Sequence, residues 1–233
     1  MGRIFDAFNE EEILMCSSRY YFIKGYATGL KLESTLKALP LCFMTHSGQY
    51  RKTTVKLMGE TRKEPYASHC LDVCSTLIAL DLPLERDELD ILLATALLHD
   101  VLEDQPQKFP EGGTEFMSLY GIDPRVLENV RVLTKHQGAT WEELEEYFHR
   151  ICEDRLCLMV KLADRGHNSS SLYVMKPEKI GKYITETKEL VYKTASYGKM
   201  RYPEFSNGIT ILKSKIKSLI NTAEALTADA EPE

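Results

Sequence analysis

Apolar residues recur at helical spacing along most of the chain. Spacings of three and four residues predict helices over residues 30–45, 66–81, 87–101, 114–121, 124–136, 141–152, 154–165, 177–197 and 205–226. No segment shows the alternation of apolar and polar residues, bounded by tight turns, that predicts a β-hairpin. We therefore expect an all-α protein, an orthogonal or irregular helical bundle, interrupted by polar loops at residues 46–65 and 105–113.

The length of the chain, 233 residues, is enough for one domain with a sizeable core. No Pro-, Gly- or Ser-rich linker divides it, so we expect a single domain over residues 31–226. Residues 1–30 form an N-terminal extension, and residues 227–233 form a frayed, solvated acidic tail. The extension is rich in aromatic residues, which predict that it packs onto the body of the protein: Phe5, Phe8, Tyr20, Tyr21, Phe22 and Tyr26.

The net charge and the hydropathy of the chain argue against nucleic-acid and membrane partners. The net charge of −6 argues against general nucleic-acid binding, which needs a basic surface. No apolar run approaches the roughly 18–20 residues of a membrane span, and the N-terminus lacks the basic region and apolar core of a signal peptide. We expect a cytoplasmic protein with no nucleic-acid or membrane partner; these patterns predict no particular oligomeric state.

The spacing of the cysteines predicts no disulfide framework and no typical zinc site. The chain has six cysteines and no CxxC pair, so we expect buried, reduced core residues. Cys70 and Cys74 share a helix face next to His69, which leaves a thiolate metal site open as an alternative.

Three carboxylates follow the apolar run from Ile91 to Leu98. Asp100, Glu103 and Asp104 stand at positions i, i+3 and i+4, so in a helix they project from one face and repel each other. A divalent metal with nitrogen and oxygen ligands would relieve that repulsion, and the adjacent His99 offers the nitrogen.

Two further segments offer matching ligands. His69 lies at the opening of an amphipathic helix, and Asp164 follows the apolar run Leu156–Val160. With His99 and Asp100 they make a set of two imidazoles and two carboxylates, which suits Mn²⁺, Fe²⁺ or Zn²⁺. Any one of these residues taken alone would more often be a hydrogen-bonded core residue; the combination of all four predicts a metal site.

The order of these residues resembles the HD phosphohydrolase superfamily and, within it, the hydrolase domain of RelA/SpoT proteins, over about residues 35–200. The resemblance is carried by His46-Ser-Gly48-Gln49-Tyr-Arg51-Lys52, Pro65-Tyr66-x-x-His69, Ala96-Leu-Leu-His99-Asp100-x-x-Glu103-Asp104, Leu133-Thr134-Lys135 and Val160-Lys161-Leu-Ala-Asp164-Arg165-x-His167-Asn168. Proteins of this family remove the 3′-pyrophosphate from the alarmone (p)ppGpp, and this chain is similar to a stand-alone small alarmone hydrolase.

The resemblance implies an HD-domain helical bundle and assigns roles to individual residues. Mn²⁺, or another divalent metal, would be held by His69, His99, Asp100 and Asp164. Glu103 and Asp104 would activate the attacking water. Arg51, Lys52 and Asn168 match positions that contact the small nucleotide substrate and its phosphates.

The charge of the segment between His46 and Tyr66 agrees with phosphate binding. Arg51, Lys52, Lys56, Arg62 and Lys63 against Glu60 and Glu64 give it a net charge of +3. The segment holds a second basic pair, Arg62-Lys63, so which pair meets phosphate stays open. Also open are an enzyme of the same class with another substrate, such as the 2′-phosphate of NADPH, and a non-catalytic nucleotide-binding module.

Overall fold

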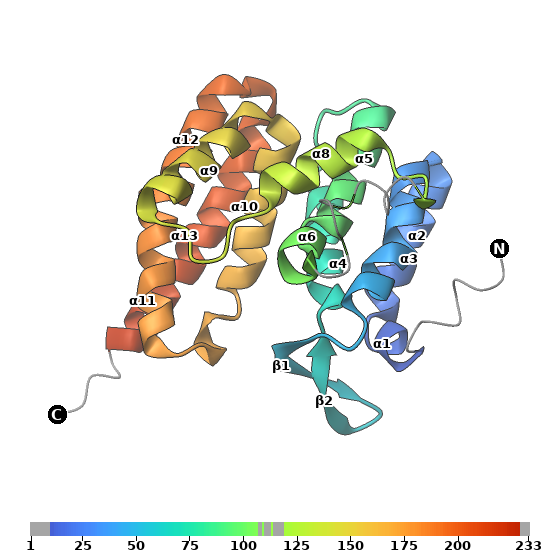
Figure 1. Ribbon diagram of the computed structural model, residues 1–233. Coiled ribbons are helices and arrows are strands. Elements are labelled where there is room, and N and C mark those ends of the chain that lie inside the picture. Colours follow the sequence, from blue (N-terminus) through green and yellow to red (C-terminus); the bar gives the residue numbers. More distant parts are fainter. Residues whose placement is uncertain (1–9, 107–108, 110–112, 114–118, 229–233) are drawn as a thin grey trace. The chain divides into compact units, whose positions relative to one another are not determined.

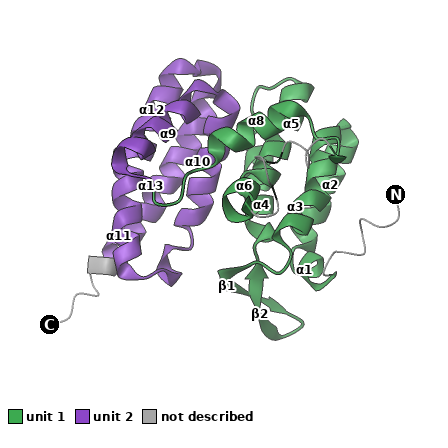
Figure 2. Cartoon of the chain, in the orientation of Figure 1, with its two compact units in different colours: residues 1–138 green, residues 139–233 purple. Residues whose placement is uncertain are grey.

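The computed structural model of the protein describes residues 10–106, 109, 113 and 119–228 (Figure 1). The chain divides into two compact units, residues 1–138 and 139–233 (Figure 2). The single domain over residues 31–226 stays a prediction. The boundary between the two units, at residues 138 and 139, lies within that range. The expected tail and the expected helix over residues 114–121 lie largely outside the described residues.

Unit 1 is built of helices and one small sheet. Its elements are α1 (Glu10–Met15), α2 (Ser17–Leu30), α3 (Glu33–His46), β1 (Tyr50–Leu57), β2 (Glu60–Pro65), α4 (Ala67–Ala79), α5 (Arg86–Leu98), α6 (Val101–Asp104) and α8 (Pro124–Leu133). Every residue from Ile91 to Leu98 is buried, so α5 is the central helix of the unit and α3, α4 and α8 pack against it. The prediction of an apolar helix leading to His99 is confirmed.

Side chains from neighbouring elements fix the ends of these helices. The Asp90 carboxylate of α5 accepts hydrogen bonds from the backbone N–H groups of Ser34 and Thr35, at 2.9 and 2.7 Å, and so caps the start of α3. Asp123 precedes Pro124 and accepts a hydrogen bond from the N–H of Arg125 at the start of α8.

Residues 50–65 form a β-hairpin, so the prediction of a polar loop over residues 46–65 is wrong for most of that segment. β1 and β2 are antiparallel, and Leu57 pairs with Glu60 across the two-residue turn Met58-Gly59. Both turn residues have positive φ, 51° and 87°, as a hairpin turn requires. The alternation was hard to recognise because the inward positions of β1 are only half-buried and mix charged, polar and apolar residues.

The N-terminal extension is helical where it is described. Tyr20 is buried and lies edge-on to Phe43, with ring centroids 5.7 Å apart, so the predicted aromatic packing is confirmed there. It is wrong for Tyr21 and Phe22, whose side chains are 62% and 50% exposed. Phe5 and Phe8 lie outside the described residues.

The described secondary structure of unit 2 consists of helices and helical turns. It contains α9 (Trp141–Glu153), α10 (Arg155–Ser169), the 3₁₀ turn η4 (Leu172–Val174), α11 (Pro177–Glu186), the π-turn η5 (Thr187–Val191), α12 (Tyr192–Arg201), the 3₁₀ turn η6 (Pro203–Phe205) and α13 (Ser206–Ala228). Helix α10 is buried along most of its length and packs against α9, α12 and α13.

Two local features explain where α9 begins and how closely α12 packs on α10. Thr140 and Glu143 form a reciprocal capping box at the start of α9. At Gly198 a Cβ atom would lie 2.2 Å from Leu158 Cδ2, so glycine is needed for α12 to approach α10 this closely. The all-α class is confirmed, with the hairpin as its one described exception.

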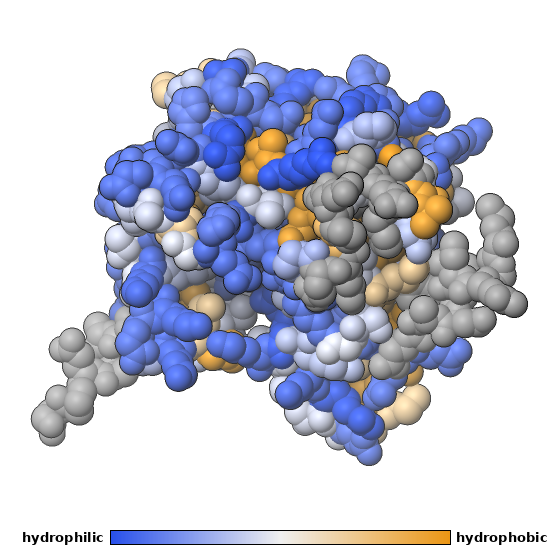
Figure 3. All heavy atoms as spheres, in the orientation of Figure 1, coloured by the Kyte–Doolittle hydropathy of each residue, from blue (hydrophilic) through white to orange (hydrophobic). Residues whose placement is uncertain are grey.

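The space-filling view in Figure 3 shows the hydropathy of one face of the molecule. On the face drawn in Figure 3, hydrophilic residues predominate and apolar residues are exposed singly or in small groups. No helix among the described residues is both long and apolar enough to cross a membrane.

Candidate metal centre and its surroundings

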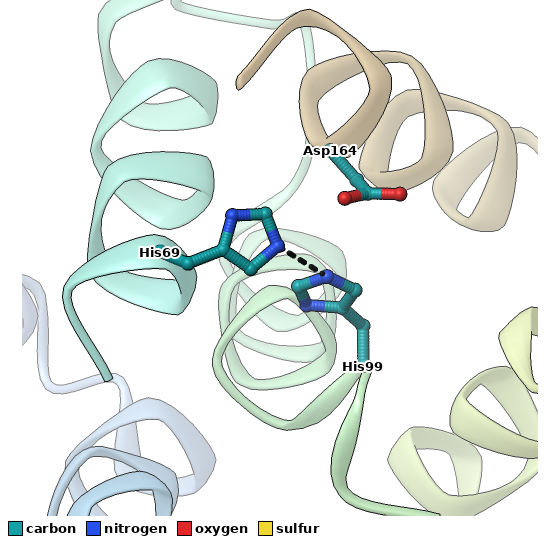
Figure 4. A group of neighbouring side chains, drawn as sticks. All are labelled: His69, His99 and Asp164. Carbon is teal, nitrogen blue, oxygen red and sulfur yellow. Dashed lines mark hydrogen bonds between the residues drawn. The ribbon is translucent and has the colours of Figure 1, made fainter. Parts of the chain in front are cut away.

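Two imidazoles meet where one helix ends and another begins. His99 follows the last residue of α5, and His69 lies in the first turn of α4, which starts directly after the hairpin. Their Nε2 atoms face one another at 3.3 Å (Figure 4). Both side chains are buried, so the sequence prediction that these two residues come together is confirmed.

The Asp100 carboxylate joins them. Its Oδ2 lies 3.3 Å from His69 Nε2 and 3.2 Å from His99 Nε2. Ligands about 2.1 Å from a divalent metal are about 3.0–3.4 Å from one another in octahedral or tetrahedral geometry. The three donor atoms therefore have the mutual spacing of ligands on one metal ion.

The tautomer of His99 also suits metal binding. Its Nδ1 lies 2.8 Å from the carbonyl oxygen of Ala96, which can only accept a hydrogen bond, so Nδ1 carries the proton. In the neutral ring Nε2 then presents its lone pair toward His69 and Asp100. A backbone carbonyl that fixes the remote nitrogen in this way is the usual support of a metal-binding histidine.

The Asp100 carboxylate is ionised in this setting. Burial by itself raises its pKa, but the positive charge and hydrogen bonds that the His99 and His69 imidazoles supply in their protonated forms outweigh that effect and hold the pKa well below its ordinary value; a cation bound by the neutral rings would act in the same direction. The Tyr66 hydroxyl donates a 2.8 Å hydrogen bond to Oδ2. Burial and the charges of Asp100 and Asp104 raise the Tyr66 pKa, so the phenol remains protonated as a donor.

A sulfur atom lies near the same group. The ligand atoms of Cys70, His99 and Asp100 are within 4.8 Å of one another. However, a hydrogen bond to Cys42 and burial raise the pKa of the Cys70 thiol well above its ordinary value. The nitrogen and oxygen donors are therefore better suited to hold a metal, and all six cysteines are buried and reduced as predicted.

The two acidic residues of α6 are held from different sides. Glu103 accepts a 3.1 Å hydrogen bond from the backbone N–H of Lys135. Asp104 accepts a 3.0 Å hydrogen bond from the side-chain amide of Gln49. Both carboxylates are half-buried and start from the short helix that follows Asp100, so they lie one turn beyond the candidate ligand.

The hairpin separates its basic residues. Arg51 and Lys52 are consecutive on β1, so their side chains project from opposite faces; Arg51 is half-buried and Lys52 exposed. Arg62 on β2 forms ion pairs with Glu60, at 2.5 Å, and with Glu11, at 3.4 Å. The positive charge of Arg62 is therefore paired with two carboxylates of the protein.

Asp164 lies in unit 2, near the C-terminal end of α10. Its two oxygens accept hydrogen bonds from Lys161 Nζ at 2.9 Å and from Asn168 Nδ2 at 2.6 Å. Burial lowers the pKa of Lys161, but Asp164 and Tyr147 outweigh it and raise the pKa well above the ordinary value. Lys161 therefore stays charged beside the carboxylate.

Tyr66 and Gln49 stand in the motifs that carry the resemblance, but sequence reasoning assigned them no role; in the structure they support the acidic side chains. His46 Nδ1 lies 2.8 Å from Gln49 Oε1. His136 and His149 are exposed.

Comparison with known proteins finds relatives that match part of the chain. No family model matches the chain. The chain is 31% identical over 140 residues, 57% of its length, to the bifunctional (p)ppGpp synthase/hydrolase SpoT of Escherichia coli. It is 30% identical over 150 residues, 62% of its length, to the guanosine-3′,5′-bis(diphosphate) 3′-pyrophosphohydrolase of Haemophilus influenzae.

A third relative is named as a pyrophosphokinase and not as a hydrolase. The chain is 35% identical over 135 residues, 54% of its length, to the GTP pyrophosphokinase rsh of Brucella ovis. It spans only 16–20% of the length of these relatives. The resemblance drawn from the motifs is confirmed: over more than half of its length, this chain is similar to proteins of the RelA/SpoT type.

Proposed function

We propose that this protein is a metal-dependent hydrolase that removes the 3′-pyrophosphate of (p)ppGpp, giving GDP or GTP and pyrophosphate. The observation that carries the proposal is the convergence of His69, His99 and Asp100, with donor atoms 3.2–3.3 Å apart, one turn before an acidic pair. The names of the similar proteins in Escherichia coli and Haemophilus influenzae support the choice of reaction.

The metal would be held by His69, His99 and Asp100 of unit 1, with Asp164 as the fourth ligand. Asp164 is included because it stands in the Asp-Arg-x-His-Asn motif and because its carboxylate has polar partners that hold it in place, Lys161 and Asn168. Mixed nitrogen and oxygen donors suit Mn²⁺. When bound, such an ion neutralises charge on the phosphoryl oxygens and lowers the barrier to attack by water.

The acidic pair of α6 would act on that water. Asp104 and Glu103 orient the water and accept its proton as the new oxygen–phosphorus bond forms. The bond between that phosphorus and the 3′ oxygen of the ribose breaks, pyrophosphate is released, and the 3′ oxygen takes up a proton. Gln49 donates a hydrogen bond to the Asp104 carboxylate and the Lys135 N–H donates one to that of Glu103, so the two carboxylates are held by different donors.

The substrate would be held by Arg51, Lys52 and Asn168. The hairpin that carries the two basic residues has a net charge of +3 in a chain of net charge −6, which favours a polyanionic ligand there. Arg51-Lys52 is preferred over Arg62-Lys63 because it stands in the His46–Lys52 motif that carries the resemblance.

The test is a nucleotide panel. Purified protein with Mn²⁺ is incubated separately with ppGpp, pppGpp and NADPH, and pyrophosphate and phosphate are measured. We expect pyrophosphate from both alarmones and no comparable phosphate release from NADPH. The opposite ratio would assign the site to another nucleotide, and binding of ppGpp without any product would indicate a non-catalytic module.

The roles of the acidic pair are tested by Glu103→Gln and Asp104→Asn. General acid–base catalysis contributes about 10²–10⁴-fold, so each variant should lose activity in that range while still binding Mn²⁺. Unchanged hydrolysis in both variants would remove these residues from the mechanism.

A further inference from the structure

Gln49 lies between the end of α3 and the start of β1, and its backbone is fixed on both sides. Its N–H donates a 2.9 Å hydrogen bond to the carbonyl oxygen of His46, and its own carbonyl oxygen accepts one of 2.9 Å from the N–H of Tyr66. The side chain therefore starts from a defined position between two elements of the metal centre.

The orientation of the Gln49 amide follows from its partners. Oε1 accepts hydrogen bonds from Gln105 Nε2 at 2.9 Å and from His46 Nδ1 at 2.8 Å. Nε2 donates to Asp104 Oδ2 at 3.0 Å. A flipped amide would direct its oxygen at the Asp104 carboxylate and its NH₂ at the NH₂ of Gln105, losing both bonds, so one orientation is selected.

The imidazole of His46 contacts two residues, Gln49 and Tyr66, each of which hydrogen-bonds to an acidic side chain. The ring is 1% exposed and stacks on Tyr66, with ring centroids 4.8 Å apart and an interplanar angle of 30°. Tyr66 in turn donates its hydroxyl hydrogen to Asp100. One buried ring thus contacts the residues that hold both the candidate ligand Asp100 and the water-activating Asp104.

We propose that Gln49 is a positioning residue for hydrolysis: its amide holds the Asp104 carboxylate in the orientation that acts on water, and His46 fixes that amide. The inference rests on the proposed function, because it assumes the role proposed there for Asp104 in activating water. Gln49 acts through Asp104, to which its amide donates.

The test is a double-mutant cycle on turnover with Gln49→Leu, Asp104→Asn and the double variant. The same substitution at an exposed position, Gln137→Leu, is the matched control. We expect Gln49→Leu to lower kcat about 10- to 100-fold with KM and Mn²⁺ affinity within about twofold, because only the orientation of the general base is lost. Gln137→Leu should retain wild-type kcat.

In the Asp104→Asn background, adding Gln49→Leu should change the residual kcat less than about twofold, since residues that act as one unit are not additive. An equal loss in both backgrounds, or no loss in the single variant, would overturn the proposal.

A second readout does not depend on activity. In ¹³C NMR, the side-chain carboxyl resonance of Asp104, assigned through Asp104→Asn, should move in Gln49→Leu and not in Gln137→Leu. An unmoved resonance contradicts the positioning role. A wild-type protein that hydrolyses no nucleotide contradicts the proposed function instead, so the two failures can be told apart.

Discussion

Each unit contains a buried cluster of charged side chains, and the two clusters are built in opposite ways. In unit 2 the Arg165 guanidinium pairs with the Glu186 carboxylate, donates a 3.2 Å hydrogen bond to Thr187 Oγ1 and lies over the ring of Tyr183, 4.3 Å from its centroid. Its charge is compensated inside the cluster.

In unit 1 the donor atoms of His69, His99 and Asp100 all face one point, as the ligands of a cation would. Burial is similar in the two places, so burial of charge alone does not indicate function. What distinguishes a candidate site is that lone pairs converge where a positive charge would stabilise them.

The largest effect is expected from Asp100→Asn. The variant replaces a carboxylate ligand with a neutral amide, so Mn²⁺ affinity should fall steeply and hydrolysis of ppGpp should drop at least about 10³-fold. Titration calorimetry with Mn²⁺ and a pyrophosphate assay measure the two effects. Wild-type affinity for the metal in this variant would contradict the distinction drawn between the clusters.

Arg165→Met should affect folding. It removes the guanidinium that pairs with the Glu186 carboxylate, and breaking a largely buried ion pair in this way costs about 3–5 kcal/mol of unfolding free energy. Denaturant unfolding compares this variant with Asp100→Asn, both free of metal. If Asp100→Asn were the more strongly destabilised of the two, the cluster of unit 1 would be structural.

Tyr66→Phe gives a smaller and more specific effect. It deletes the hydroxyl that donates to Asp100 and keeps the ring that stacks on His46. Removal of a hydrogen-bond partner of a metal ligand costs about 10–100-fold in affinity or activity. An exposed tyrosine, changed in Tyr173→Phe, is the control, and a loss shared by both variants would argue against the contact with Asp100.

An effect confined to alkaline pH concerns Cys16, a buried ionisable group outside both clusters. Burial raises the pKa of its thiol from 9.0 to about 12. The protonated thiol is favoured in the folded state, so its contribution to stability is complete below about pH 9 and is lost as the pH rises toward 12. The difference in unfolding free energy between wild type and Cys16→Ala should therefore shrink between these pH values; a constant difference would contradict the shift.

The sequence predicted the helices well because their apolar faces follow the helical period over long stretches. It also predicted the candidate ligands of unit 1, since His99 and Asp100 end an uninterrupted apolar helix and His69 begins another. The hairpin was missed because β1 buries only one face, and that face mixes Arg51 and Thr53 with Val55 and Leu57.

The roles of Gln49 and Tyr66 could not be predicted for a different reason, although both residues stand in motifs of the resemblance. Neither is charged, and each acquires its role through a contact more than thirty positions away along the chain, with Asp104 and Asp100 respectively. Such contacts depend on how α3, the hairpin and α4 pack, and the spacing of residues does not encode them.

The most direct test of the account is pyrophosphate release from ppGpp by protein stripped of metal and then titrated with Mn²⁺. Activity should be absent at first and rise until the candidate site of each chain is filled, and His99→Ala should stay inactive throughout. Hydrolysis by the stripped protein, or equal activity in His99→Ala, would contradict the assignment of this cluster as the metal centre.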